Sequence, residues 1–206
     1  MIHGPGLLFV ISGPSGAGKD TLVEAVRGRV PRLMYSVSAT TRTARAGERE
    51  GEHYFFLSRE AFERRIAEDG FLEWREYGGH LYGTPRDAVD RVLQRGDDLI
   101  AKPEVHGALA IKHAYPEATL IFLLPDKFST LRERLLERRT ESNEAIVARL
   151  VIAHEEMRSI REFDYLVINE QRQLERAVDD LQSILQAERF RIHRYSDDII
   201  RKVEHS

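Results

Sequence analysis

The chain has 206 residues, of which 42% are hydrophobic and 32% charged, and its formal net charge at pH 7 is -3. This length and composition fit one compact unit with a single core. The near-balanced charge gives no general attraction to nucleic acid or to an anionic membrane. The absence of cysteine excludes disulfides and cysteine-based metal sites. No apolar stretch approaches the ~20 residues of a membrane span, and no basic segment precedes the first apolar run, so we expect a cytoplasmic protein.

A glycine-rich segment follows the apolar run Leu7–Ile11 and precedes apolar residues at helical spacing. It reads Gly13, Pro14, Ser15, Gly16, Ala17, Gly18, Lys19, Asp20, Thr21. Glycines permit the tight turn in which backbone N–H groups and a helix N-terminus converge on an anion, and Lys19 can reach the outer phosphates of a nucleotide. A glycine-rich turn that binds nothing is the alternative, but strand, loop and helix follow one another as phosphate binding requires. We therefore expect a donor-nucleotide site here.

Strands and helices alternate along the rest of the chain. Strands are predicted at 34–38, 99–101, 119–124 and 164–168, and helices up to about 29, then at 85–95, 105–114, 127–161 and 174–185. The apolar runs at 7–11 and 119–124 lack alternation, which is typical of parallel strands covered on both faces. Thr84 is expected to cap the helix that begins at Pro85. The pattern predicts an α/β fold, with a parallel sheet flanked by helices and right-handed crossovers.

The segment 38–84 interrupts this alternation. Residues 39–52 are small, charged or hydroxylic, and on composition alone they fit a solvated turn as well as a functional loop. Strand-like runs at 54–57 and 71–74, with a helix between them, predict a small inserted α+β subdomain. The other segments are expected to form the core of one domain spanning 1–206: 1–37, 85–126 and 162–190.

Residues 127–161 are helical in pattern and rich in arginine. The arginines are Arg132, Arg134, Arg138, Arg139, Arg149, Arg158 and Arg161. One interpretation is a solvated helical face balanced by glutamates such as Glu155 and Glu156, which is common for charge runs. The other is a lid over a polyanion, because Arg134 and Arg138, four residues apart, share one helix face. The last stretch, 188–206, mixes apolar and charged residues and could pack on the core or form a dimer contact.

Three further segments indicate the acceptor. They are Ser38 to Glu48, Phe71 to Trp74 and Leu81 to Pro85. Together with the glycine-rich loop they resemble the guanylate kinase family, from Leu7 to about Leu185. The resemblance implies a P-loop kinase core with a GMP-binding insertion at 38–84 and a helical lid at 127–161. It also implies reversible transfer of the γ-phosphate of ATP to GMP with Mg2+ as cofactor, in purine nucleotide metabolism. ATP and GMP are the expected substrates, with dGMP a further candidate, in a monomer or a homodimer.

The resemblance also assigns individual residues. The positions that correspond to the GMP site are Ser38, Arg42, Arg45, Glu48, Tyr54, Glu73, Tyr82, Thr84 and Glu104. Among them two arginines and two tyrosines hold the phosphate, which suits guanidinium forks and phenolic donors, and Glu48 supports the arginines. Glu73 can accept hydrogen bonds from guanine N1–H and the 2-amino group, whereas adenine lacks that pair of donors. The resemblance places catalytic roles on Lys19, Arg134, Arg138 and Arg149. The hydroxyl residue that usually holds Mg2+ after the loop lysine is replaced here by Asp20, with Thr21 behind it. Asp20 could ligate the ion directly or through water, or it could repel the phosphates and leave Thr21 to supply the hydroxyl, and we favour a Mg2+-linked role for Asp20.

Three positions depart from the family pattern. Asp20 stands where Ser or Thr is usual, Lys102 where relatives commonly have an acid, and Arg139 where glycine is common. Two alternatives therefore stay open. A guanylate kinase-like binding module uses the GMP face for phosphopeptides, but it usually has a degraded phosphate loop. A kinase for a phosphorylated sugar can carry Asp after the loop lysine, but it lacks the guanine-reading residues.

Overall fold

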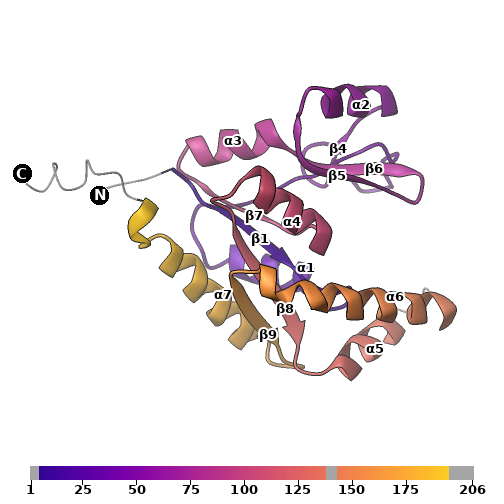
Figure 1. Ribbon diagram of the computed structural model, residues 1–206, viewed down its shortest axis with the longest axis vertical. Coiled ribbons are helices and arrows are strands. Elements are labelled where there is room, and N and C mark those ends of the chain that lie inside the picture. The colour runs from indigo at the N-terminus through magenta and orange to yellow at the C-terminus, as the bar shows by residue number, and fades with distance from the viewer. Residues whose placement is uncertain (1–4, 138–142, 195–206) are drawn as a thin grey trace, which may run out of the picture.

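The computed structural model describes residues 5–137 and 143–194 (Figure 1). Its larger sheet has five parallel strands in the order β2-β7-β1-β8-β9. These strands are β1 (Leu8–Ser12), β2 (Leu33–Tyr35), β7 (Asp98–Ala101), β8 (Thr119–Pro125) and β9 (Tyr165–Asn169). The predicted α/β fold with a parallel sheet is confirmed.

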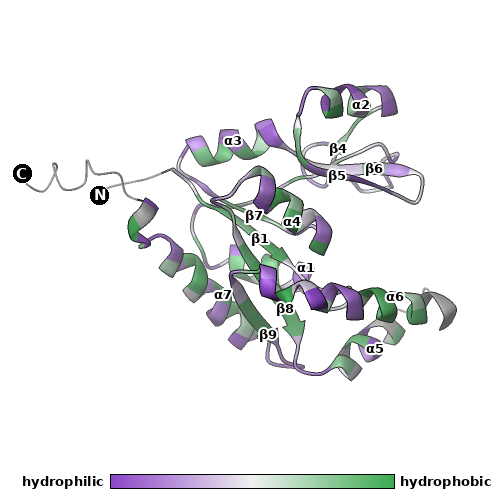
Figure 2. Ribbon diagram, viewed as in Figure 1, coloured by the Kyte–Doolittle hydropathy of each residue, from purple (hydrophilic) through white to green (hydrophobic). Residues whose placement is uncertain are grey.

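Helices cover both faces of this sheet. They are α1 (Lys19–Arg27), α3 (Arg86–Gln94), α4 (Val105–Ala114) and α7 (Leu174–Glu188). Phe9 and Ile11 of β1 belong to the apolar cluster that contains residues of α1 and α7, whereas Leu8 and Val10 belong to the cluster that contains residues of α3 and α4. Every residue of β1 is buried for this reason. Figure 2 shows the resulting hydrophobic character along β1 and β8.

A smaller sheet is built from β3 (Ala39–Thr40), β4 (Phe55–Phe56), β5 (Phe71–Tyr77) and β6 (His80–Pro85), in the order β4-β3-β6-β5. The helix α2 (Arg59–Ala67) packs on it, with the rings of Phe62 and Phe71 stacked at 4.3 Å between centroids. Since β6 runs directly into α3, and β5 packs against α4, the small sheet is fixed to one side of the core.

The arginine-rich segment forms α5 (Phe128–Glu137), α6 (Asn143–Glu156) and the 3-10 helix η1 (Met157–Glu162). In Figure 1, α5 and the outer part of α6 lie beyond the end of the sheet toward which β1 and β8 point. Among the described residues, no helix combines the length and the apolar character needed to cross a membrane.

The predicted role of Thr84 as a helix cap is wrong. Thr84 lies in β6, and Pro85 occupies the N-cap position of α3 with no side-chain hydrogen bond. The Thr84 hydroxyl instead donates to Glu73 Oε1 at 2.7 Å, from the strand position paired with Glu73. The Thr84 hydroxyl, which the local sequence pattern predicted as a helix cap, therefore bonds to Glu73 on the neighbouring strand.

The end of α7 is tied to the sheet by a buried carboxylate. Glu188 is fully buried and accepts hydrogen bonds from Thr119 Oγ1 at 3.0 Å, Tyr165 Oη at 2.6 Å and Arg194 Nη2 at 2.6 Å. Burial by itself raises the pKa of this carboxyl, but the three donors outweigh it, so the pKa lies below its ordinary value. Glu188 and Arg194 of η2 (Ile192–Arg194) thus tie this stretch to the core by polar contacts, whereas Phe190 and Ile192 are 78% and 80% exposed. Residues 195–206 lie outside the described part of the chain.

Replacing Glu188 with Ala should lower the free energy of unfolding by roughly 3 kcal/mol, because the donors of Thr119, Tyr165, Arg191 and Arg194 lose their acceptor. Urea unfolding followed by circular dichroism measures the loss. Glu175→Ala is the matched control on the same helix, since Glu175 pairs with Arg29 at the surface and its removal should cost under about 1 kcal/mol. Equal losses in the two variants would contradict the anchoring role.

Candidate active site

The loop between β1 and α1 has the geometry of an anion site. Gly13 and Gly18 have φ angles of 143° and 97°, which L side chains rarely adopt. A Cβ at Gly13 would also lie 2.2 Å from the carbonyl oxygen of Leu123. Gly18 occupies the N-cap position of α1 without a side-chain hydrogen bond, so the positive end of the helix dipole faces the loop without a side-chain cap.

Lys19 is folded over this loop. Its Nζ donates to the carbonyl oxygens of Gly13 at 2.5 Å and Pro14 at 3.3 Å. Burial lowers the pKa of Lys19, and the carboxylates of Glu156, Glu104 and Asp20 oppose that shift. The ammonium is held by neutral carbonyls that an anion in the loop could replace.

Glu156 contributes a charge that the sequence analysis did not place. The charge pattern suggested a solvated helical face, yet Glu156, at the end of α6, is only 9% exposed. Burial raises the pKa of its carboxyl, and the nearby charge of Lys19 opposes that shift. The sequence does not distinguish Glu156 from its neighbour Glu155, which is the same residue type in the same charge run but is exposed.

Two of the three predicted lid arginines contact the loop. Arg134 Nη1 donates to the carbonyl oxygens of Gly16 at 3.3 Å and Ala17 at 3.1 Å. Arg149 Nη1 donates to Ser15 Oγ at 3.2 Å. Arg138, like Arg139, lies outside the described residues. The charged helices therefore bring guanidinium groups to the phosphate-loop residues, which favours the lid interpretation over a purely solvated face.

A cavity of about 400 Å3 adjoins the loop on one side. It is lined by Gly16, Gly18, Thr21, Arg134, Asn169, Glu170, Arg172 and Leu174. Asn169 ends β9, and its Nδ2 donates to the carbonyl oxygen of Ala17 at 2.7 Å. No sequence motif marks this cavity, although it lies beyond the carboxyl end of a parallel strand, where α/β proteins commonly bind ligands.

The arginine-containing loop of 39–52 is ordered by an ion pair. Arg42 Nη2 lies 2.7 and 2.9 Å from the two carboxylate oxygens of Glu48, and the backbone N–H of Arg45 donates to Glu48 Oε2 at 2.7 Å. The hydrogen bond from Arg42 is the main cause that lowers the pKa of Glu48 to about 2. Arg42 also lies 5.4 Å from the ring centroid of Tyr54, whose ring meets Tyr82 at 6.1 Å. The side chain of Arg45 is exposed.

Glu73 faces α4 from the small sheet. The side chain accepts the hydrogen bond of Thr84 described above, and burial raises the pKa of its carboxyl. A Cβ at Gly107 in α4 would lie 3.1 Å from Glu73 Oε2, so the glycine leaves room for the carboxylate. Glu104, also assigned to the base site, is paired with Arg75 of β5.

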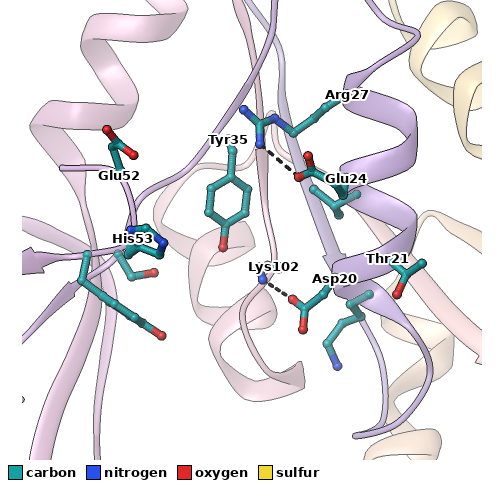
Figure 3. Close-up of a pocket in the computed structure, with 12 residues that line it drawn as sticks. Asp20, Thr21, Glu24, Arg27, Tyr35, Glu52, His53 and Lys102 are labelled. Atoms are coloured by element: carbon teal, nitrogen blue, oxygen red, sulfur yellow. Dashed lines mark hydrogen bonds and ion pairs between the residues drawn. The ribbon is translucent and has the colours of Figure 1, made fainter. Parts of the chain in front are cut away.

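A second cavity, of about 730 Å3, separates the phosphate loop from the small sheet (Figure 3). Lys19, Asp20 and Thr21 line it from α1, and Ser38 and Tyr54 line it from the acceptor-side segment. The other lining residues are Val23, Glu24, Arg27, Tyr35, Glu52, His53 and Lys102. The lining does not include Glu73, Thr84, Arg42 or Tyr82. Arg42 and Tyr82 adjoin the cavity through Tyr54, which contacts both.

Comparisons with known proteins agree with this arrangement. A family model described as guanylate kinase matches residues 6–188. A guanylate kinase of Carboxydothermus hydrogenoformans is 47% identical over 90% of each chain. A guanylate kinase of Thermus thermophilus is 50% identical over 93% of this chain and 86% of its own. The crystal structure of guanylate kinase from Anaplasma phagocytophilum matches with a TM-score of 0.71 at 29% identity, over 94% of this chain and 92% of that one.

The chain belongs to the guanylate kinase family. Its activity is that of a nucleoside monophosphate kinase, an ATP:GMP phosphotransferase. The family match extends over both sheets, which sets aside the sugar kinase that lacks the guanine-reading segments. Membership of this family also accounts for a phosphate loop that faces the small sheet across the larger cavity.

The donor set fits the way in which kinases hold Mg2+. Within 5–137 and 143–194, no group of three or more His, Cys, Asp or Glu side chains could hold a metal ion. Mg2+ usually binds through one or two protein oxygens together with substrate phosphates, and it needs no cage of protein ligands. The Thr21 hydroxyl and the Asp20 carboxylate offer such oxygens, and both residues line the larger cavity.

The raised pKa of Glu73 predicts a pH dependence for GMP binding. The ionised carboxylate can accept from both guanine donors, so affinity for GMP should fall as the pH falls through that raised pKa. Calorimetric titration of GMP between about pH 8 and pH 5 measures the effect. Glu73→Gln should bind GMP more weakly, and its remaining pH dependence should be that of the GMP phosphate, whose second pKa is about 6. Identical pH profiles in wild type and variant would remove Glu73 from the base site.

Proposed function

We propose that ATP and GMP bind on opposite sides of the larger cavity, with the donor phosphates on the Gly13–Thr21 loop and GMP on the small sheet. The observation that carries this proposal is the lining of that cavity, which joins Lys19 and Thr21 to Ser38 and Tyr54. Transfer requires donor and acceptor oxygens to lie in line within one enclosed space. A cavity between the two sets of residues supports that requirement.

On the donor side, backbone N–H groups of the loop hold the ATP phosphates, and Lys19 exchanges its two carbonyl partners for phosphate oxygens. Arg134 and Arg149, which lie in the lid, neutralise negative charge on the phosphates. Arg138 is the third arginine of this set. Thr21 and Asp20 are the residues that would hold Mg2+, which would neutralise negative charge on the donor phosphates. The ATP base occupies the smaller cavity beside Asn169.

On the acceptor side, Arg42, Arg45, Tyr54 and Tyr82 hold the GMP phosphate. Glu48 already fixes the Arg42 side chain and the Arg45 backbone, so the ordering cost of this loop is met before GMP arrives. The guanine edge is read by Glu73, Thr84 and Ser38, with Glu104 close by through Arg75. Because adenine lacks the matching donors, AMP would leave a buried carboxylate unpaired.

The lid closes over both substrates and excludes water, so that transfer outcompetes hydrolysis. We infer action in the cytoplasm on free nucleotides, without nucleic acid or membrane, with dGMP as a further acceptor and either a monomer or a homodimer as the acting species. Turnover with GMP and dGMP at fixed ATP tests dGMP as an acceptor. Sedimentation with and without both nucleotides tests whether a monomer or a homodimer acts.

Arg42→Ala should raise the KM for GMP about 10- to 100-fold, because charge-assisted bonds to a phosphate are lost, while the KM for ATP should hardly change. Arg45→Ala should act in the same direction. Arg49→Ala is the matched control, since Arg49 lies in the same loop and pairs with Glu52 at the surface. If ATP affinity fell as much as GMP affinity, the division between donor and acceptor sides would be wrong.

Lys19→Ala should lower kcat at least about 100-fold, because the ammonium stabilises charge on the phosphoryl group in the transition state. The thermal midpoint should stay close to wild type, since Lys19 bonds only to carbonyls of its own loop. A coupled ATP/GMP assay with a melting curve makes both measurements. Near-normal turnover in a folded variant would exclude Lys19 from the reaction.

A further inference from the structure

Two of the departures from the family pattern meet in the structure. Lys102 follows β7, Asp20 lies in the first turn of α1, and the Lys102 Nζ donates to Asp20 Oδ1. Figure 3 shows the pair at the cavity, with the Tyr35 hydroxyl on the same side as the Lys102 ammonium. The segment that carries Lys102 is fixed by Ser12 Oγ, which donates to the carbonyl oxygen of Pro103 at 2.9 Å. Asp20 and Lys102, which are far apart in the sequence, therefore form one ion pair.

The ion pair places the Lys102 ammonium at the cavity. The Lys102 side chain is 28% exposed, and its Nζ lies 5.2 Å from the ring centroid of Tyr35. Asp20 is 75% exposed at its side chain and open to the cavity. Asp20 thus has two ammonium groups near it, that of its chain neighbour Lys19 and that of Lys102.

Asp20 needs such a partner because of where it stands. A carboxylate in the first turn of α1, next to Lys19, lies beside the proposed site of the donor phosphates and repels them. The hydroxyl residue that is usual at this position carries no such charge. A fixed ammonium within bonding distance of Asp20 cancels the repulsion, whereas a solvated counter-ion would do so only weakly.

We propose that Lys102 is a positioning residue that neutralises Asp20 in the metal-free site and competes with Mg2+ for the Asp20 carboxylate. This inference rests on the proposed donor site at Gly13–Thr21. Without Lys102, the free carboxylate repels metal-free ATP and becomes available to a divalent ion. The two consequences have opposite signs, so they can be separated from a general loss of the site.

The first test is calorimetric titration of ATP in EDTA with wild type, Lys102→Met, Asp20→Asn and the double variant. Lys102→Met should bind metal-free ATP about tenfold more weakly. The double variant should return to within about twofold of wild type, because removing both charges restores the balance. A Lys102→Met affinity within twofold of wild type would overturn the proposal. So would a double variant as weak as Lys102→Met, because Lys102 would then act on ATP and not through Asp20.

The second test follows Mn2+, as a probe for Mg2+, by electron paramagnetic resonance with a non-hydrolysable ATP analogue. Lys102→Met should lower the Mn2+ concentration for half-saturation about threefold or more, and the double variant should not. If the Mn2+ concentration for half-saturation is unchanged or higher in Lys102→Met, Lys102 does not compete with the metal ion for Asp20, and the proposal is overturned. Arg91→Gln, which removes a cation paired with Asp87 on α3, controls for net charge and should match wild type.

Failure of this inference can be told from failure of the donor site itself. Wild type should bind ATP with Mg2+, and Lys19→Ala should lose much of that binding. If wild type does not bind ATP, the donor site is misplaced. If it binds and Lys102→Met behaves as wild type in both tests, only the role of Lys102 is wrong. Circular dichroism melting curves show that each variant is folded.

Discussion

A guanylate kinase has to bring together two nucleotide phosphates that repel one another, and on the proposed arrangement this constraint explains where the charged side chains lie. Cations reach the loop region from separate parts of the chain: Lys19 from α1, Lys102 after β7, and Arg134 and Arg149 from the lid. Each is held by a carbonyl, a hydroxyl or a carboxylate of the protein. The site therefore keeps its positive charge organised without substrate, and less reorganisation is needed when the anions bind.

The parallel sheet is what allows these segments to converge. Because all five strands run in one direction, the residues that follow β1, β7, β8 and β9 emerge at the same edge. The phosphate loop, Lys102, α5 and Asn169 lie at these four strand ends. The smaller sheet supplies what that edge cannot: a carboxylate beside Thr84 and an arginine locked to Glu48. The proposed donor side thus depends on strand direction, and the proposed acceptor side depends on a cross-strand hydrogen bond and on an ion pair within the loop of 39–52.

The sequence predicted the parts that depend on local pattern. The phosphate loop and the parallel strands were recognisable because their residues are close together in the chain, whereas the loop of 39–52 was assigned to the acceptor only through the family resemblance. Contacts between distant residues were not: Lys102 and Asp20 are 82 residues apart, and Glu156 approaches Lys19 only through packing of α6. Thr84 shows the conflict directly, since its capping pattern was outcompeted by Glu73, 11 residues earlier. Burial, too, cannot be read from a charge run, in which Glu155 is exposed and Glu156 is not.

The central claim is that the small sheet selects the acceptor by its guanine edge while the core handles phosphate from ATP. The most direct measurement is kcat/KM at fixed ATP for GMP, IMP, AMP, UMP and CMP, all carrying the same 5′-phosphate. The account predicts GMP highest, IMP lower because it lacks the 2-amino donor, and AMP lower by about 10^4-fold because the buried Glu73 carboxylate is left unpaired. An AMP value within about tenfold of GMP would show that the base is not read there, and would contradict the account.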